Sequence, residues 1–537
     1  MATQLRDPFN VSGYLVDRHV EAGDGGREAV RVPGEALDYA QLADRVARVA
    51  AALRGAGVRP EERVVLLMPD GVELLTGILG AMRMGAVAVP VSTMLTGTEL
   101  ATLVSDSRAR TLVASRALGE IAGVAAAGSP ELTELIVHGG GQQPDVRPDV
   151  TVVDWDEFLA GGDGQAVEAY PTWADSPALW LYTSGTTGTP KAAMHRHGSI
   201  RDVVETYGTQ VLGIRPDDRC LSVAKLFFAY GIGNSAFFPL GVGATTVLEP
   251  ARPTPASIAE RVASERPTLF FGVPTFYSAL LASDVPDDTF DSVRQGVSAG
   301  EPLPASLFTR VRDRFGFEVL DGIGSTEALH IFVSNRPGQV RPGSSGTPVP
   351  GYEVQLRDSD GGLLGQGETG ALFVRGPSIA TGYWCRTDVT RATFQGEWLR
   401  TGDTYLRNED GTYSYLGRSD DMIKAGGMWV SPAEVEARLL EHPSVAEAAV
   451  VAVPDESGLD KPVACVVAAP GATIDAGELD AFCREGLAAF KRPRQVVEVA
   501  ELPKTATGKI RRFELRDSMS RSADVEPAEP VTGGALA

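Results

Sequence analysis

The chain has 537 residues, which is too long for one ordinary domain, so we expect two or more. Its 49 Lys and Arg residues against 70 Asp and Glu residues give a formal net charge of −21, which argues against nucleic acid and anionic membranes as partners. The 4 cysteines are widely spaced and form no CxxC motif, and no apolar signal segment opens the chain. We therefore expect a cytoplasmic protein.

Helical and strand patterns alternate in the first part of the chain. Asp38 and Gln41 have the spacing of a capping box and open an amphipathic helix predicted over 38–53. Strand-like runs at 64–68 and 86–91 enclose a helical pattern over 72–84. Helices that alternate with short apolar strands predict an α/β fold with parallel-rich sheets.

A new pattern begins after a charged, glycine-rich stretch at 417–427. Ser431 and Glu434 have the spacing of a second capping box, with Pro432 at the first helical position. Strand-like runs at 448–453 and 463–468 follow, and then a helix near 479–489. This pattern predicts a small α+β domain, and the Pro- and Gly-containing tail predicts disorder.

The segment 181–191, Leu-Tyr-Thr-Ser-Gly-Thr-Thr-Gly-Thr-Pro-Lys, has the composition of a phosphate-binding loop. Glycines let the backbone bend around a polyphosphate, while hydroxyl groups and a lysine contact its oxygens. It is not a Walker A loop, because Pro190 stands where the second glycine is required. A plain surface linker is the alternative reading. The candidate phosphate ligands are Thr183, Ser184, Gly185, Thr186, Thr187, Gly188 and Lys191.

Further motifs follow this loop in a fixed order. They are Ser-Ala-Gly-Glu at 298–301, Asp-Gly-Ile-Gly-Ser-Thr-Glu at 321–327, Thr-Gly-Asp at 401–403, Gly-Arg-Ser-Asp-Asp-Met-Ile-Lys at 417–424 and Pro-Lys-Thr-Ala-Thr-Gly-Lys at 503–509. Taken together, they resemble the adenylate-forming superfamily of acyl-CoA synthetases, adenylation domains and luciferases. The segments 225–234 and 323–332 closely resemble its benzoate-CoA ligase branch.

The resemblance implies a reaction in two steps with ATP, Mg²⁺ and coenzyme A. A small aromatic carboxylic acid attacks the α-phosphorus of ATP, and the resulting acyl-adenylate then reacts with the thiol of CoA. Because the first step brings carboxylate and triphosphate charges together, cations must lie at the reacting atoms. By resemblance, Lys509 bridges the carboxylate and the α-phosphate, Thr326 contacts the α-phosphate, and Glu327 holds the metal.

The same resemblance assigns the remaining contacts to the nucleotide and the acid. Asp403 is expected at the ribose hydroxyls, Arg418 near the nucleotide and Asp321 near the adenine amine. The other nucleotide contacts are Gly300, Glu301, Pro302, Gly322 and Ile323, where many relatives have an aromatic residue in place of Ile323. The aryl-acid pocket is expected to comprise Ala229, Tyr230, Gly231, Gly324, His330 and Ile331, with Phe227 interpreted as core packing.

Domain movement is also implied by the resemblance. We expect a large adenylation domain over 1–418, a hinge region over 419–427 pivoting at Asp420, a mobile C-terminal domain over 428–520 and a disordered tail over 521–537. The CoA tunnel is expected to include Lys424, Ala425, Gly426 and Gly427. The Lys509 segment resembles sites modified by protein acetyltransferases, and the protein is expected to be a monomer or a homodimer.

Three alternative functions stay open. Gly296, Ser298 and Gly300 match the Gly-x-Ser-x-Gly elbow of serine hydrolases, although the prolines that follow disfavour an immediate helix. A non-catalytic nucleotide-binding module would be expected to lack Glu327 or Lys509, and both are present. An enzyme that loads an aryl acid onto an acyl carrier protein is the closest alternative, because a carrier and CoA present the same pantetheine arm.

Overall fold

The computed structural model describes residues 7–162, 167–184, 190–419, 421–425, 428–454, 460–504 and 510–523. The chain forms two compact units. The first unit comprises Met1–Glu368, Leu372–Thr401 and Arg407–Ser414, and the second comprises Thr369–Ala371, Gly402–Leu406 and Tyr415–Ala537. The exact domain boundaries stay a prediction.

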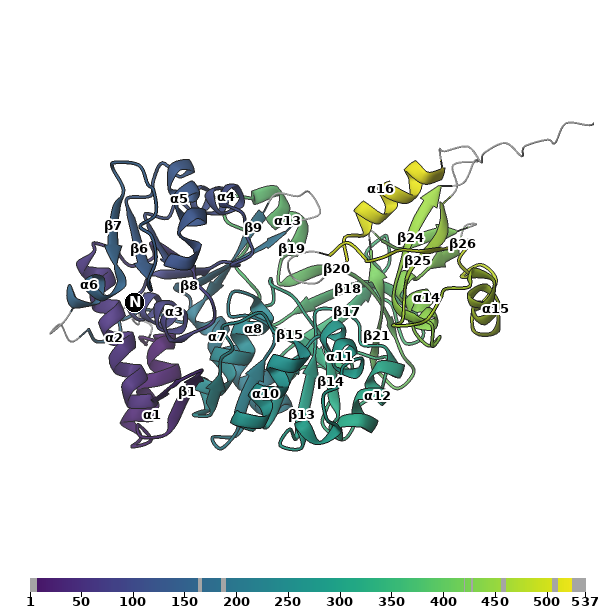
Figure 1. Ribbon diagram of the computed structural model, residues 1–537, viewed down its shortest axis with the longest axis horizontal. Coiled ribbons are helices and arrows are strands. Elements are labelled where there is room, and N and C mark those ends of the chain that lie inside the picture. The colour runs from purple at the N-terminus through teal and green to yellow at the C-terminus, as the bar shows by residue number, and fades with distance from the viewer. Residues whose placement is uncertain are drawn as a thin grey trace, which may run out of the picture. The chain divides into compact units, whose positions relative to one another are not determined.

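A nine-stranded sheet in the first unit carries much of the candidate site (Figure 1). Its strands pair in parallel from β1 to β14, and antiparallel pairs close both edges. In spatial order they are β16 (Thr347–Pro348), β15 (Ile331–Ser334), β14 (Val319–Gly324), β13 (Gln295–Ser298), β12 (Leu269–Gly272), β10 (Arg219–Ser222), β11 (Thr245–Val247), β1 (Glu28–Val32) and β2 (Glu35–Asp38).

A seven-stranded sheet forms the second layer of strands in this unit. Neighbouring strands within this sheet pair in parallel, except that β8 and β9 form an antiparallel pair. The spatial order is β7 (Thr151–Asp154), β6 (Glu134–His138), β5 (Thr111–Ser115), β3 (Arg63–Leu67), β4 (Val87–Pro90), β8 (Pro177–Ser184) and β9 (Pro190–Arg196). The predicted parallel-rich α/β fold is therefore confirmed.

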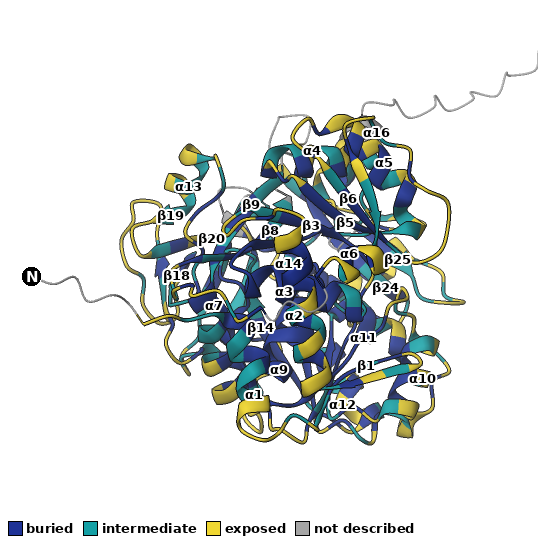
Figure 2. Ribbon diagram, turned by 90° about the vertical axis from the view of Figure 1, so that its left-hand side faces the viewer, coloured by how far each residue is buried: buried dark blue, intermediate teal, exposed yellow. Residues whose placement is uncertain are grey.

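Helices cover these sheets because their apolar faces need burial. Side chains of α10, α11 and α12 pack against β10, β12 and β14 in one cluster, and those of α4 and α5 pack against β3, β5 and β6 in another. Figure 2 shows buried strands beside helices whose outer faces are exposed. The helices are α1 (Arg18–Glu21), α2 (Tyr39–Gly55), α3 (Val72–Arg83), α4 (Gly97–Ser107), α5 (Gly119–Gly128), α6 (Trp155–Ala160), α7 (His197–Val203), α8 (Ala229–Ile232), α9 (Phe238–Val242), α10 (Pro255–Glu265), α11 (Pro274–Leu281), α12 (Ala305–Phe315) and α13 (Thr387–Thr393).

The predicted start of α2 is confirmed in detail. Asp38 accepts a hydrogen bond from the Gln41 backbone, and the Gln41 side chain accepts one from the Asp38 backbone, so both arms of the capping box form. The predicted helix at 72–84 and the strands at 64–68 and 86–91 correspond to α3, β3 and β4, with ends shifted by one residue or so.

The second unit is built around a three-stranded sheet, in which β25 pairs antiparallel with β24 and parallel with β26. Apolar side chains of α14 and α15 pack on one face, and Leu515 of α16 packs on the other. The predicted tail begins inside α16, and residues beyond Ala523 lie outside the described residues. The elements are β22 (Ile423–Ala425), β23 (Met428–Val430), α14 (Pro432–Leu439), β24 (Val445–Pro454), β25 (Asp460–Ala468), α15 (Ala476–Gly486), β26 (Gln495–Glu498) and α16 (Arg512–Ala523).

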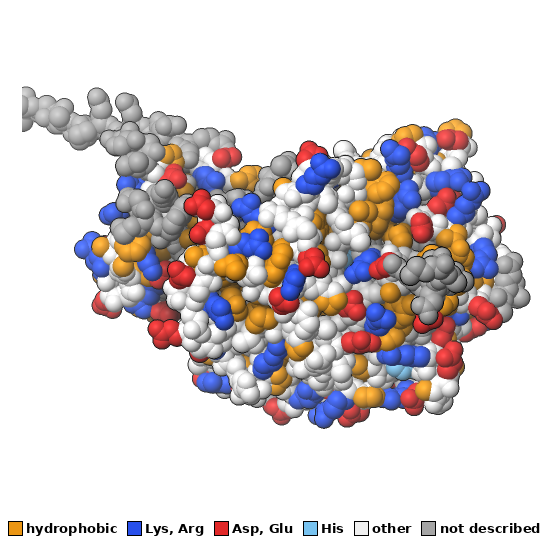
Figure 3. Space-filling model, turned by 180° about the vertical axis from the view of Figure 1, so that it is seen from behind, with side chains coloured by type: hydrophobic (Ala, Val, Ile, Leu, Met, Phe, Trp, Pro, Cys, Tyr) orange, Lys and Arg blue, Asp and Glu red, His pale blue; other side chains and the backbone are white. Residues whose placement is uncertain are grey.

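A further sheet has the order β17-β18-β20-β19, and β21 pairs with β20. Its strands are β17 (Glu353–Arg357), β18 (Thr369–Arg375), β19 (Phe394–Gln395), β20 (Trp398–Arg407) and β21 (Tyr413–Arg418). On the molecular face shown in Figure 3, acidic and basic side chains are interspersed. None of the described helices has the length and apolar character of a membrane span.

Candidate active site

The candidate phosphate loop connects two antiparallel strands. Thr183 near the end of β8 faces Lys191 near the start of β9, and both are half-buried. Residues 185–189, which include the predicted ligands Gly185, Thr186, Thr187 and Gly188, lie outside the described residues, as does the side chain of Ser184. A hairpin with a lysine at its base can bring one cation and several backbone N–H groups to a phosphate.

The turn that contains Thr326 and Glu327 joins β14 to β15. The Nε2–H of His195 donates to the Thr326 carbonyl at 2.8 Å, and the Ala380 N–H donates to the Glu327 carbonyl at 2.8 Å. Burial lowers the pKa of His195 to about 4, so the imidazole is neutral near pH 7. Leu329 has a φ of +68°, a strained value for a residue other than glycine. The turn is therefore held in a specific conformation by elements on both sides.

Glu327 is the candidate metal ligand. Among the described residues, no group of three or more His, Cys, Asp or Glu side chains could hold a metal ion. A single carboxylate nevertheless fits Mg²⁺, which keeps several waters and binds through one or two carboxylates together with substrate phosphates. The donor set therefore suits a metal that arrives with ATP and does not suit a resident structural ion.

The predicted adenine contacts lie at the carboxyl ends of β13 and β14. Asp321 is only 7% exposed, and its Oδ1 has no hydrogen-bond partner among the described residues. Burial raises its pKa well above the usual range. Gly300 has a φ of +90°, and the Glu301 carboxylate accepts from the Thr275 N–H at 3.3 Å. Of the other predicted contacts, Gly322 is buried, Ile323 is half-buried and Pro302 is exposed.

The structure brings the predicted aryl-pocket residues together. The Tyr230 hydroxyl donates to the carbonyls of Gly272 and Val297 at 3.1 and 3.2 Å, so the ends of β12 and β13 fix its ring. The Tyr230 and His330 rings lie 5.5 Å apart. Ile331 is buried beside His330, and Ala229 begins α8, the helix that also carries Tyr230. Phe227 is buried, as the core-packing interpretation expects.

His330 is a buried, neutral hydrogen-bonding group among these residues. It is 3% exposed, and burial lowers its pKa to about 3. Its Nε2 lies 3.1 Å from Oδ1 of Asn234 and 3.3 Å from the Tyr230 carbonyl. Because a carbonyl can only accept, Nε2 carries the proton and Nδ1 is the acceptor. Nδ1 has no partner among the described residues.

Two features of the backbone make room for this arrangement. A Cβ added to Gly231 would lie 2.0 Å from the Lys225 carbonyl oxygen, and one added to Gly324 would lie 2.6 Å from that of His330. Both predicted glycines are therefore required by close backbone approach. A π-helical stretch at Gly233–Phe237 supplies Asn234, and such stretches often occur at functional sites.

The loop that leads into α8 is anchored by a buried carboxyl group. Asp70 is 2% exposed, and its Oδ1 accepts from the Leu226 N–H at 3.0 Å. The Lys225 ammonium donates to the carbonyls of Glu249 and Ala251, at 2.8 Å for Ala251. Burial raises the pKa of Asp70 to about 7, and the nearby Lys225 charge opposes that increase.

The remaining predicted residues belong to the second unit. Arg418 donates to Oδ1 of Asp403 at 3.0 Å, and Gly402 has a φ of +79° beside them. Lys424 and Ala425 form β22, but their side chains lie outside the description. Asp420, Gly426, Gly427 and Lys509 also lie outside the described residues. The ends of the lysine loop are close together, because Lys504 and Ile510 form an antiparallel bridge.

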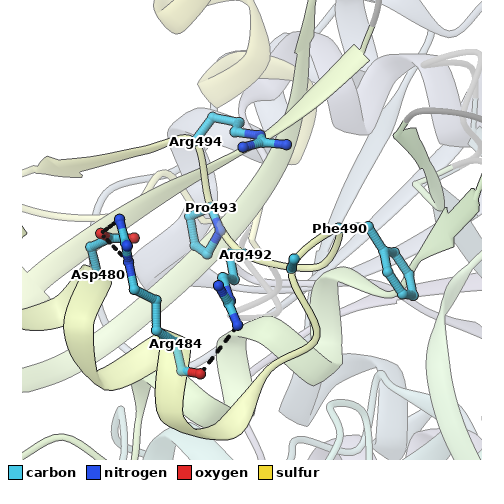
Figure 4. Close-up of a pocket in the computed structure, with 7 residues that line it drawn as sticks. Asp480, Arg484, Phe490, Arg492, Pro493 and Arg494 are labelled. Carbon is cyan, nitrogen blue, oxygen red and sulfur yellow. Dashed lines mark hydrogen bonds and ion pairs between the residues drawn. The ribbon is translucent and has the colours of Figure 1, made fainter.

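The second unit also contains a pocket that sequence reasoning missed. Figure 4 shows Arg484, Phe490, Arg492 and Arg494 around it, in a cavity of about 440 Å³ that Asp480 also lines. Arg492 donates to the carbonyls of Leu487 and Arg484 at 3.0 and 3.3 Å, which fixes its guanidinium. Figure 4 also shows the Phe490 ring turned away from the arginine side chains, and Arg484 pairs with Asp480 at 2.7 Å. Guanidinium groups suit a phosphorylated ligand. The sequence feature that could have indicated this pocket is the basic run Lys-Arg-Pro-Arg at 491–494, which is unusual in an acidic chain.

The serine-hydrolase alternative is not supported by the local geometry. A nucleophile elbow places its serine on an exposed turn directly between a strand and a helix. Ser298 instead ends β13 with 0% exposure, and α12 begins only at Ala305. Ser298 therefore lacks the exposed strand-to-helix turn that a nucleophile elbow requires.

Comparison with known proteins identifies the family. The family model for AMP-binding enzymes matches residues 16–384, and the model for the AMP-binding enzyme C-terminal domain matches residues 434–509. The chain belongs to the AMP-binding enzyme family. This family membership agrees with the resemblance drawn from the motifs, and the predicted benzoate-CoA ligase branch is confirmed by the relatives.

The relatives of this AMP-binding enzyme include ligases of aromatic acids. It is 44% identical to a benzoate--CoA ligase of Thauera aromatica, over 96% of this chain and 97% of the relative. It is 42% identical to a 4-hydroxybenzoate--CoA/benzoate--CoA ligase of Rhodopseudomonas palustris, over 99% and 98%. A crystal structure of the anthranilate CoA ligase AuaEII with anthranoyl-AMP matches with a TM-score of 0.91 at 38% identity, over 98% of this chain and 100% of that chain.

Proposed function

We propose that the protein is an ATP-dependent aryl-acid:CoA ligase that makes benzoyl-CoA or a ring-substituted benzoyl-CoA. The reaction passes through an acyl-adenylate, with release of pyrophosphate and then AMP. The observation that carries this proposal is the buried cluster of Tyr230 and His330. His330 lies in the β14–β15 connection that also carries Thr326 and Glu327, so the candidate aryl-acid contacts and the candidate phosphate and metal ligands share one segment.

In the first half-reaction, the residues of the first unit position the nucleotide and its charges. Lys191 contacts the phosphates from β9, Thr326 contacts the α-phosphate, and Asp321 accepts a hydrogen bond from the adenine amine. Glu327 would hold Mg²⁺, which neutralises phosphate charge when it is bound. Oriented donors and cations of this kind stabilise the charge that develops at the α-phosphorus.

Asp403, Arg418 and Lys509 complete the proposed nucleotide contacts from the second unit. The hydrogen bond from Arg418 orients the Asp403 carboxylate, which would accept from the ribose hydroxyls. Lys509 would bridge the acid and the α-phosphate, because a flexible ammonium suits a point-charge contact. It would leave after adenylation, when rotation at Asp420 brings the 424–427 segment to the pantetheine arm of CoA.

Ring substituents are read by His330 in this proposal. Its neutral imidazole offers the Nδ1 lone pair as an acceptor, which favours a substituent that can donate. Hydroxyl and amino groups ortho to the carboxylate meet that requirement. We therefore propose salicylate- and anthranilate-type acids as substrates in addition to benzoate.

The basic pocket of the second unit is proposed to hold the nucleotide part of CoA. Arg492 and Arg494 would face its phosphates, while Arg484 pairs with Asp480 at the edge of the pocket. The acceptor is thus proposed to be CoA, which carries the phosphorylated adenosine that this pocket suits. A carrier-protein thiol, the alternative acceptor, lacks that group.

Three further proposals concern the setting of the reaction. Acetylation of Lys509 by a protein acetyltransferase would remove the charge needed for adenylation and silence the enzyme. A cytoplasmic location is proposed because all four cysteines, each among the described residues, are free. A monomer or a homodimer is proposed as the oligomeric state.

A panel of acids tests the proposed function. Benzoate, salicylate, anthranilate and octanoate would each be assayed for pyrophosphate release at saturating ATP. A ring needs little ordering in a flat pocket, whereas octanoate must order many rotors. We expect the aryl acids to exceed octanoate by at least ~100-fold in kcat/KM, or about 2.7 kcal/mol. Equal rates for octanoate and benzoate would show that the pocket is not built for a ring.

A further inference from the structure

A tyrosine outside the predicted set contacts both the candidate metal ligand and the phosphate-loop lysine. The Tyr383 hydroxyl donates to Oε1 of Glu327 at 2.6 Å. The Nζ atom of Lys191 lies 5.5 Å from the centroid of the same ring. The side chain of Tyr383, which belongs to a third segment of the first unit, thus lies next to both Glu327 and Lys191.

The backbone around Tyr383 is fixed to β9, the strand that carries Lys191. Tyr383 forms an antiparallel bridge with Ala193, and the Trp384 N–H donates to the Ala192 carbonyl at 3.0 Å. Figures 1 and 2 both show β9 beside the segment that leads into α13. Tyr383 is 7% exposed, and its ring packs against that of Phe394 with the centroids 5.4 Å apart. Tyr383 therefore has little freedom to move relative to Lys191.

These contacts have a defined chemical consequence for Glu327. A hydrogen bond from a hydroxyl to a carboxylate at this distance is charge-assisted and strong. It restricts the rotamer of a side chain that otherwise turns about three bonds, so the Glu327 carboxylate would be held in place to bind a metal. A lysine within about 6 Å of a tyrosine ring is attracted to its face. One aromatic side chain thus sets the spacing between a cation and a carboxylate that act on the same triphosphate.

We propose that Tyr383 is a positioning residue for adenylation, holding the Glu327 carboxylate at the metal and Lys191 at the phosphates. This inference rests on the proposed function through the metal role of Glu327. It predicts that the hydroxyl of Tyr383 governs metal affinity, whereas its ring governs the position of Lys191. Partners that orient metal ligands typically change metal affinity or activity by about 10–100-fold when removed.

The test uses the full-length protein and Mn²⁺ as the probe. Binding of Mn²⁺ in the presence of a non-hydrolysable ATP analogue is followed by electron paramagnetic resonance. We expect Tyr383→Phe, which keeps the ring, to weaken Mn²⁺ binding by about 10–100-fold. The Mg²⁺ concentration for half-maximal pyrophosphate release should rise in parallel, while thioester formation from supplied benzoyl-adenylate stays unchanged.

Tyr39→Phe is the matched control. Tyr39 is buried, at 0% exposure, and its hydroxyl donates a 2.7 Å hydrogen bond, but to the Ala244 carbonyl. This variant loses a buried hydroxyl of the same kind without touching Glu327, so Mn²⁺ binding should be retained. Weakening of equal size in both variants would mean a general structural effect and would overturn the proposal.

Glu327→Gln separates this inference from the proposed function. We expect the variant to weaken Mn²⁺ binding, and we expect Tyr383→Phe to add little in that background, because both changes remove one coupled unit. If Glu327→Gln weakens binding and Tyr383→Phe does not, the positioning role is wrong while the metal assignment stands. If Glu327→Gln leaves binding unchanged, the metal assignment fails, and the inference fails with it.

Discussion

Replacement of His330 by alanine tests the proposal that this residue recognises ring substituents of the acid. The imidazole Nδ1 is a buried acceptor, and a neutral hydrogen bond contributes about 0.5–1.5 kcal/mol net. At 1.4 kcal/mol per factor of ten, its loss should reduce the preference for an ortho donor about 2–10-fold. The quantity to compare is kcat/KM for salicylate or anthranilate divided by kcat/KM for benzoate. The KM for ATP should change less than this ratio does.

The same variant should also lose stability, because His330 donates to Asn234 and packs against Phe238 at 4.5 Å. An unsatisfied buried acceptor costs about 1–3 kcal/mol, to which the cavity adds. Phe238→Leu is the matched control, since it loosens the same packing but leaves both imidazole nitrogens in place. This control should lower kcat/KM for all aryl acids in proportion. If His330→Ala leaves the substrate ratio unchanged and weakens ATP alone, the pocket assignment is wrong.

Three other variants test separate parts of the account. Lys509→Ala should reduce pyrophosphate release by about 10²–10³-fold and largely spare thioester formation from supplied benzoyl-adenylate. Equal loss of rate in both half-reactions would contradict the proposed role of Lys509. Arg492→Ala should raise the KM for CoA several-fold without changing pyrophosphate release. An unchanged KM would show that CoA does not bind in that pocket. Asp70→Asn should change how the stability of the protein depends on pH. Burial raises the pKa of Asp70 in the folded state to about 7, so its carboxyl group contributes stability at low pH. That contribution is lost as the pH rises from about 4 to 7. The unfolding free energy of the wild type minus that of the variant, from urea titrations, should fall by about 1–3 kcal/mol between pH 5 and pH 8, and a constant difference would show that Asp70 titrates normally.

Local chemistry made much of the fold predictable. The capping box at Asp38 is predictable from sequence because its two hydrogen bonds join residues that are three positions apart. The helix predicted near 479–489 is wrong at its ends: α15 begins after Asp475, whose side chain accepts from Gly477 and Glu478, and it ends at Gly486. The helical pattern predicts that a helix exists here, but it does not reveal that Asp475 caps the helix and sets its start.

Contacts across the fold could not be predicted in the same way. The motif containing Glu327 was recognised, yet its partner Tyr383 lies 56 residues away and meets it only because the 381–384 segment pairs with β9. The neutral state of His330 depends on burial by rings from several elements, which no local pattern encodes. Sequence thus supplies the candidate residues, and tertiary packing determines their protonation and orientation.

The product balance of a single reaction mixture tests the central claim most directly. The full-length protein is incubated with benzoate, ATP, Mg²⁺ and CoA, and the products are quantified by mass spectrometry and nucleotide chromatography. The account predicts benzoyl-CoA, AMP and pyrophosphate in equal amounts, with no ADP. Pyrophosphate and AMP without benzoyl-CoA, or formation of ADP, would contradict it.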